Sequence, residues 1–134
     1  MSFHDLYRMS SHAVITNTEK QVLLLKATYA DAAWGLPGGG LDVGETIHQA
    51  LIRECKEELG CDIEILYLSG AYFHPTVHSH AFIFRCQFKQ NQQIQLSHEH
   101  SAYQWFDVTE LSPVQQIRVQ DCLTFNGEVR SQSF

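Results

Sequence analysis

Hydrophobic residues in this chain fall into short runs separated by polar segments. The first two runs, AVITN at 13–17 and QVLLLKA at 21–27, flank the polar stretch NTEK and predict a β-hairpin. Three later runs, at 62–73, 80–88 and 102–108, have the length of strands, and the second of them alternates. The polar segment KQNQQIQLSHEHS, which precedes the last run, predicts a loop around a short strand.

Two segments have a helical pattern instead, and a loop precedes the first of them. This loop, residues 34–45 (WGLPGGGLDVGE), is predicted because the segment contains one proline and several glycines. A helix follows, with Thr46 as its N-cap and Gly60 as the glycine that ends it. Residues 109–125 predict a second helix with a break near Pro113. The order of strands, helix, strands and helix predicts one mixed domain over residues 1–134, rather than alternating βαβ units.

The first helix carries an unusual arrangement of charge. Three glutamates fall within RECKEELG at 53–60, at spacings where like charges repel on a helix. At 100° per residue they lie beside the apolar face, whereas the basic and amide side chains take the third side. The apolar face consists of Leu51, Ile52, Cys55 and Leu59, and the third side consists of Gln49, Arg53 and Lys56. The arrangement favours a cation among the carboxylates over an ordinary solvated surface.

Composition and charge limit the kinds of partner that this protein is expected to bind. The formal net charge is -6, from nine basic and fifteen acidic residues, and the basic residues form no stripe. This argues against binding long nucleic acid through its backbone, but a small phosphorylated ligand that is held by a divalent cation remains open. No run reaches membrane-spanning length and no secretory signal is present, so we expect no membrane partner and a cytoplasmic location. The four cysteines form no CxxC pair, which predicts reduced, partly buried thiols.

The glycine-rich loop and the glutamate helix form one continuous motif. GGLDVGETIHQALIRECKEELGC, residues 39–61, resembles the Nudix box, G-x5-E-x7-R-E-U-x-E-E-x-G-U, where U is a bulky apolar residue. The fixed positions all match, at Gly39, Glu45, Arg53, Glu54, Glu57, Glu58 and Gly60. Both U positions are cysteines, Cys55 and Cys61, which behave as small hydrophobic residues and leave the packing intact.

The resemblance to the Nudix hydrolase family implies an α+β fold, a Nudix-like α/β/α sandwich with a mixed β-sheet between helices. It implies hydrolysis of a pyrophosphate bond in a nucleoside diphosphate linked to another moiety, with Mg²⁺ or Mn²⁺ as the cofactor. Metal ligands carried over from the family are Gly38, Glu54, Glu57 and Glu58. Arg53 is expected to hold a box glutamate, and Glu57 is within its reach. Glu45 is expected to brace the junction of loop and helix or to lie in an outer shell.

Residues outside the motif complete the expected site. Glu99 lies in a loop before an aromatic strand, where many Nudix enzymes have a metal ligand or general base, and a surface role is the alternative. Catalytic candidates are therefore Arg53, Glu54, Glu57 and Glu99, and the substrate-binding candidates are Trp34, His74 and Tyr103. His100 is a further residue that the resemblance places near substrate, whereas Tyr72 and Trp105 are expected in the core. No spacing of Cys and His resembles a zinc site.

The substrate stays open within the family. A nucleoside triphosphate, an oxidised one included, is the first expectation, with dinucleoside polyphosphates and nucleotide sugars as alternatives. An RNA 5′-end pyrophosphohydrolase fits the acidic balance less well. A non-catalytic domain that senses a nucleotide is the alternative from another class, but every charged residue of the motif is present, which favours an enzyme. Homodimers are common in the family, and the sequence neither supports nor excludes one.

Overall fold

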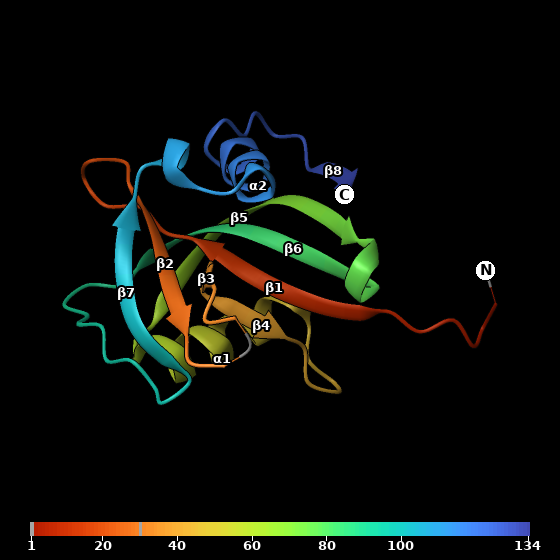
Figure 1. The fold of residues 1–134 in the computed structure, drawn as a ribbon, viewed down its shortest axis with the longest axis horizontal. Coiled ribbons are helices and arrows are strands. Elements are labelled where there is room, and N and C mark those ends of the chain that lie inside the picture. Colours follow the sequence, from red (N-terminus) through yellow and green to blue (C-terminus); the bar gives the residue numbers. More distant parts are fainter. Residues whose placement is uncertain (1, 30) are drawn as a thin grey trace.

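Strands in two sheets and two helices make up the fold. The computed structural model describes residues 2–29 and 31–134 (Figure 1). The strands are β1 Arg8–Val14, β2 Val22–Ala27, β3 Trp34–Gly35, β4 Gly38–Gly40, β5 Ile63–His74, β6 Ser79–Phe88, β7 His100–Phe106 and β8 Arg130–Ser133. The helices are α1 Ile47–Leu59 and α2 Pro113–Leu123, with short 3₁₀ turns η1 Pro75–Val77 and η2 Val108–Glu110.

The strands form a mixed five-stranded sheet and a smaller antiparallel one. The larger sheet has the order β4-β1-β6-β5-β8, and the smaller has the order β3-β2-β7. Within the larger sheet, β1 pairs with β6 and β5 with β8 in parallel, whereas β1 with β4 and β5 with β6 are antiparallel. The predicted α+β sandwich with a mixed β-layer between helices is thereby confirmed, with that layer split into two sheets.

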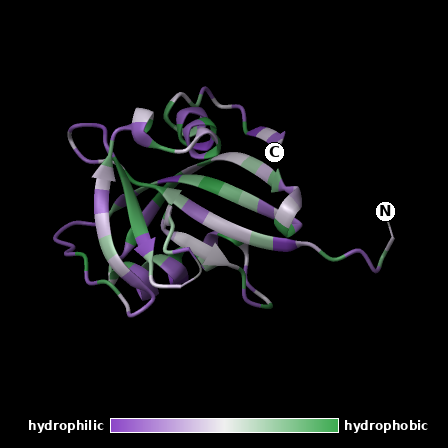
Figure 2. Ribbon diagram, viewed as in Figure 1, coloured by the Kyte–Doolittle hydropathy of each residue, from purple (hydrophilic) through white to green (hydrophobic). Residues whose placement is uncertain are grey.

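Two hydrophobic clusters lie on opposite sides of the β-layer because its strands alternate. On the α1 side, Ala13 and Phe84 pack with Leu51 and other residues of α1. On the α2 side, Val14, Ile83 and Tyr72 pack with Val119 and Cys122 of α2. Figure 1 shows the two helices on opposite sides of the strands, and Figure 2 shows β2 as a strongly hydrophobic strand between them. Successive residues of one strand therefore serve different cores.

The predicted hairpin is wrong as a description of two paired strands. The first strand starts at Arg8 and joins the five-stranded sheet, whereas β2 joins the smaller one. Among the residues that the structure describes, the two strands meet only beside the turn, where Thr16 and Val22 form an isolated antiparallel bridge and Leu23 N donates to Ile15 O at 2.9 Å. The polar residues NTEK form the expected turn, but beyond it β1 pairs with β4 and β6, whereas β2 pairs with β3 and β7.

Helix α1 confirms the predicted limits. Thr46 caps it in a capping box with Gln49, and Gly60 ends it at a left-handed φ of 66°. One face was assigned wrongly, because Ile52 is 47% exposed and Glu58 only 5% exposed. The buried arc therefore extends toward the carboxylates rather than toward Ile52.

The loops differ from expectation in three places. Segment 34–45 contains two short strands, because Trp34 and Gly35 of β3 pair with β2 and the glycines of β4 pair with β1. Segment 89–99 contains no strand, and β8 was not predicted because its side chains are all exposed and show no alternation. The second helix is divided as expected, into η2 and α2, with Ser112 as the N-cap and Pro113 in the first turn. Among the described residues, no helix is long and apolar enough to cross a membrane.

Candidate active site

The glycines of β4 lie directly against the glutamates of α1. Gly38 N donates a hydrogen bond of 2.7 Å to Glu58 Oε1. Gly38 has a φ of 137°, and a side chain there would collide with the backbone of Ser11. A Cβ on Gly39 would lie 2.8–2.9 Å from the carboxyl group of Glu54. Glycine at position 39 therefore leaves room for the Glu54 carboxyl group, and glycine at position 38 allows the backbone conformation from which the N–H reaches Glu58.

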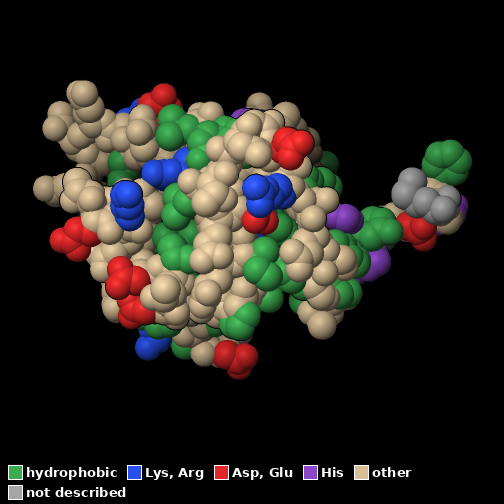
Figure 3. Space-filling view, turned by 90° about the horizontal axis from the view of Figure 1, so that it is seen from above, with side chains coloured by type: hydrophobic (Ala, Val, Ile, Leu, Met, Phe, Trp, Pro, Cys, Tyr) green, Lys and Arg blue, Asp and Glu red, His purple; other side chains and the backbone are tan. Residues whose placement is uncertain are grey.

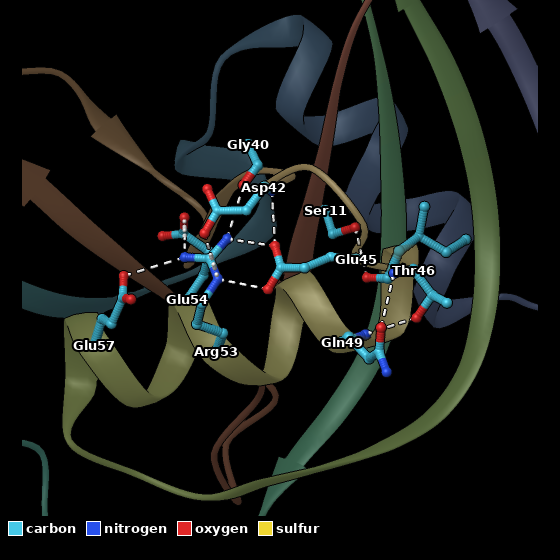
Figure 4. Close-up of polar contacts among 10 residues, drawn as sticks. Ser11, Gly40, Asp42, Glu45, Thr46, Gln49, Arg53, Glu54 and Glu57 are labelled. Carbon is cyan, nitrogen blue, oxygen red and sulfur yellow. Dashed lines mark hydrogen bonds and ion pairs between the residues drawn. The ribbon is translucent and has the colours of Figure 1, made fainter.

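Arg53 forms hydrogen bonds with the loop that precedes α1 and with the glutamates of α1 (Figure 4). Its Nε and Nη2 donate to the two carboxylate oxygens of Glu45 at 2.7 and 2.9 Å, the bidentate geometry of a strong charge-assisted pair. Nη1 donates to Glu54 at 3.0 Å and to Glu57 at 3.2 Å, and Nη2 also donates to Gly40 O at 3.1 Å. Glu57 was the expected partner and is contacted, but Glu45 is the main one. Glu45 also accepts from the Asp42 N–H at 2.8 Å, so it links loop and helix.

Four carboxylates act on one another electrostatically. Burial raises the pKa of Glu58 to about 8, against the hydrogen bond from Gly38 and with further contributions from Glu54, Glu99 and Glu57. Burial also raises the pKa of Glu54, while Arg53 lowers it and Glu57 and Glu99 raise it. The charge of the loop residue Glu99 therefore acts on Glu54 and Glu58 of the helix. Four carboxyl groups around one partly buried place, with Glu58 itself buried, favour a bound cation.

His100 lies next to Glu58, the most buried of these glutamates. Its Nε2 lies 3.5 Å from Glu58 Oε2, and both side chains are 7% exposed. Burial lowers the pKa of His100, while Glu99 raises it. The imidazole is therefore neutral near pH 7 and contacts Glu58 without neutralising it.

The oxygen-rich residues suit a hard divalent ion. Glu54 and Glu58 lie next to backbone that no side chain obstructs, and Mg²⁺ favours a few carboxylates together with substrate phosphates and water. In the described part of the chain, no three His, Cys, Asp or Glu side chains already converge on a single point. The residues fit the ion, and a complete coordination shell needs ligands from substrate or solvent.

A cavity of about 290 Å³ leads away from the carboxylates, between the two sheets. Its wall includes Glu58 and His100 at one end and Trp34 and His12 elsewhere. Trp34 packs edge-on against Phe106, with ring centroids 5.2 Å apart. The predicted substrate residue Trp34 therefore lies on the cavity that opens beside the glutamates.

Other predicted residues lie elsewhere, and two cavity residues were not predicted. His74 is at the end of β5 and does not line this cavity, and Tyr103 lines a separate hollow with Phe88 and Trp105. The residues that sequence reasoning missed are His12 and Tyr29. Extending the alternation of Val14 back to His12 would have placed that histidine on an inward face. Tyr29 carried no signal, because it follows β2 in a loop.

Comparison with known proteins identifies the family. The NUDIX domain family model matches residues 6–122, and the chain belongs to this family, as the motif predicted. A MutT-like protein from Streptomyces ambofaciens is 31% identical over 131 residues, covering 94% of this chain and 84% of that protein. An RNA pyrophosphohydrolase from Blochmanniella floridana is 41% identical over 70 residues, covering 50% of this chain and 44% of that protein.

The chain spans less than half the length of the RNA pyrophosphohydrolases that it matches. A solved structure, an ADP-ribose pyrophosphatase from Streptococcus suis 89-1591, superimposes with a TM-score of 0.75 at 21% identity, covering 96% of this chain and all of that one. At that identity the likeness concerns the fold.

Proposed function

We propose that this protein hydrolyses a pyrophosphate bond in a nucleoside diphosphate linked to another moiety, with a divalent metal ion as cofactor. The observation that carries the proposal is the placement of Glu54 and Glu58 against Gly39 and Gly38, beside a cavity that Glu58 lines, with the charges of Glu57 and Glu99 acting on both. A nucleoside triphosphate, oxidised or not, is the first choice of substrate. Nudix hydrolases generally use divalent metal ions, and Mg²⁺ or Mn²⁺ suits these oxygen ligands.

The chain's own residues have distinct parts in this reaction. Glu54, Glu57, Glu58 and the carbonyl of Gly38 would hold the ion, which supplies charge neutralisation at the phosphates and a more acidic water. Arg53 keeps Glu54 and Glu57 in place through hydrogen bonds of 3.0 and 3.2 Å. As water attacks phosphorus, a new P–O bond forms and the bridging P–O bond breaks. A carboxylate, Glu99, Glu54 or Glu57, takes the proton of the water, and the phosphorylated fragment leaves.

The walls of the cavity bind the rest of the substrate. Trp34 offers an aromatic face at its side, and a base that stacks there would place its phosphates toward Glu58. His74 and Tyr103 remain predicted substrate contacts outside this cavity.

A second candidate is the triphosphorylated 5′ end of RNA. Several relatives, including the one from Blochmanniella floridana, are RNA pyrophosphohydrolases. Basic side chains on the α2 side are dispersed rather than gathered (Figure 3), which favours the small nucleotide.

A substrate panel tests the proposal. The purified protein is incubated with nucleoside triphosphates, dinucleoside polyphosphates, nucleotide sugars and 5′-triphosphorylated RNA in Mg²⁺, and the released phosphate and pyrophosphate are measured. Glu58→Gln is expected to lose more than about 100-fold in kcat/KM, because it loses a ligand charge while keeping an acceptor for Gly38 N. Glu64→Gln, an exposed site that contacts Gln87, is the matched control. Binding without turnover of any substrate would favour a sensing domain instead.

A further inference from the structure

Arg118 is a buried cation to which the described residues give no counter-ion. It is 8% exposed, and no ion pair within residues 2–29 and 31–134 includes it. Its Nε has no hydrogen-bond partner. Burying a charge without a partner is costly, so a retained guanidinium of this kind points to a ligand that completes it.

The guanidinium extends from the face of α2 that packs on the five-stranded sheet. Arg118, Val119 and Cys122 are the buried residues of this helix. Val119 and Cys122 pack with Val14 and Tyr72 on the α2 side of the sheet. Arg118 therefore lies between α2 and the strands rather than in solvent.

Two histidines face the same space. His12 is two residues from Val14 on β1, and His74 is two residues from Tyr72 on β5, so alternation places both on the α2 side. Burial lowers the pKa of His12 and of His74, and the charge of Arg118 lowers both further. Both imidazoles are neutral at pH 7, and His74 Nε2 has no hydrogen-bond partner. Neither histidine compensates the charge of Arg118.

Small residues lie between these histidines. The register pairs Ser10 with Ala81, and Ala81 with Tyr72 on the other side. Ser10 and Ala81 fill little of the space over the sheet, and Ser79, the next residue of β6 on that face, is also small. On the same face, Phe134 packs against Tyr72 and His74, with ring centroids 5.8 and 5.2 Å apart, so Ser10 and Ala81 are the short side chains beside these rings.

Neighbours of Arg118 line the cavity of the candidate active site and the one next to it. His12 lines the 290 Å³ cavity that contains Glu58. Trp34 lines that cavity and also a neighbouring one of about 190 Å³, which includes Gln115. Gln115 is one turn before Arg118 on α2, and its buried Oε1 also lacks a partner. A substrate whose pyrophosphate lies at the glutamates can therefore extend past Trp34 toward Gln115, one turn of α2 from Arg118.

We propose that Arg118, between His12 and His74, binds an oxygen acceptor on the part of the substrate remote from the hydrolysed pyrophosphate, and thereby determines substrate specificity. The inference rests on the proposed function for the nature of the substrate. A base carbonyl and a distal phosphate both carry such an oxygen. Gln115 Oε1 needs an N–H donor nearby, and the edge of a base offers a donor beside an acceptor.

Arg118→Met and Arg118→Lys test the assignment with three probes. GTP and ATP differ at the base carbonyl, and diadenosine tetraphosphate and ATP differ in their distal phosphates. For each, kcat/KM is measured in Mg²⁺ and Kd is measured by calorimetry without added metal. We expect Arg118→Met to lose about tenfold or more for GTP relative to ATP. Arg118→Lys should lose less kcat/KM for GTP, because lysine keeps the positive charge although it lacks the paired N–H donors of the guanidinium. A selective loss for diadenosine tetraphosphate instead would support the assignment with phosphate as the acceptor.

Arg85→Met is the matched control for stability. Arg85 donates to the carbonyls of Val14 and Cys86 at 3.0 and 2.8 Å and to Thr16 Oγ1 at 2.7 Å, so it is an arginine with a structural role. We expect Arg85→Met to lower Tm without changing the ratio between probes, and Arg118→Met to leave Tm unchanged or raise it, because it removes an uncompensated charge.

Two results would overturn the inference. One is an equal effect of Arg118→Met on all three probes, and the other is a loss of Tm like that of Arg85→Met with unchanged ratios. If the wild-type protein hydrolyses none of the probes, the proposed function fails, and the Kd ratios still decide the role of Arg118.

Discussion

The two sides of the β-layer differ in how each accommodates an arginine. Arg53, on the α1 side, has acidic partners and a backbone carbonyl within hydrogen-bond distance, with Glu45 held by two bonds. Arg118, on the α2 side, is more deeply buried and has no acidic partner among the residues that the structure describes. The acceptors of Arg53 are part of the protein, whereas Arg118 has no acceptor for its Nε among residues 2–29 and 31–134, and we propose that substrate supplies one.

The difference teaches how the two halves of a binding site are built. On the α1 side the protein positions its own charges, so that a cation and phosphates meet a prepared arrangement. On the α2 side it retains donors and acceptors that only a ligand satisfies, which makes binding selective. One side would then serve every substrate, and the other would distinguish among substrates.

Arg53→Lys is the substitution with the largest expected effect on this comparison. Lysine cannot hold both oxygens of Glu45 and also reach Glu54, so the carboxylates lose their positions. We expect kcat/KM to fall by about 10- to 100-fold for all substrates alike. Steady-state assays on GTP, ATP and diadenosine tetraphosphate check both the size and the uniformity of the loss.

Lys56→Met is the control for that experiment, because Lys56 lies on the same helix, is largely exposed and pairs only with Asp62 at 3.3 Å. It should leave activity within about twofold of wild type, since exposed ion pairs contribute little. A substrate-dependent loss in Arg53→Lys would remove the distinction between the two sides.

Gly39→Ala should have a smaller effect. A Cβ at this position would lie 2.8–2.9 Å from the Glu54 carboxyl group, which has to move away. We expect Mg²⁺ to be bound about tenfold more weakly, as read from the metal dependence of the rate. Gly40→Ala is a sharp control, because the nearest atom to its Cβ would be Met9 O at 3.9 Å. Equal behaviour of the two variants would show that Glu54 does not need this approach.

The pH dependence of stability reports on the α2 side and has the smallest expected effect. Burial lowers the pKa of His12 to about 3, and Arg118 and His74 contribute. The unfolded chain takes up a proton near pH 6.5, whereas the folded protein does not, so stability is lost as the pH falls below 6.5. One proton changes the stability by about 1.4 kcal/mol per pH unit below pH 6.5, so the loss between pH 7 and pH 5 is at most about 2 kcal/mol. Urea denaturation at both pH values should show a smaller difference in His12→Asn than in wild type.

The sequence predicted the α1 side in detail because its determinants are local. The partners of Arg53 lie within thirteen residues of it, so spacing alone brought them together. Thr46 and Gly60 marked the ends of the helix through their own side-chain and backbone preferences. The exposure of Ile52 was missed, because the strands and not the helical period decide which arc is covered.

The α2 side was hardly predictable. His12, His74 and Arg118 come from β1, β5 and α2, and only the strand pairing of the five-stranded sheet places the first two on one face. The predicted hairpin kept the first strand too short to include His12. An arginine within an otherwise ordinary helix gave no indication that it lacked a partner.

The four free thiols can report which part of the molecule unfolds first. Cys55, Cys61 and Cys86 are in the α1-side core and Cys122 is in the α2-side core, all fully buried. Burial raises the pKa of Cys86 to about 12, so a thiol reagent should react only after local or global unfolding. Mass spectrometry of the order in which these cysteines are labelled would show which core loosens first, without any introduced probe.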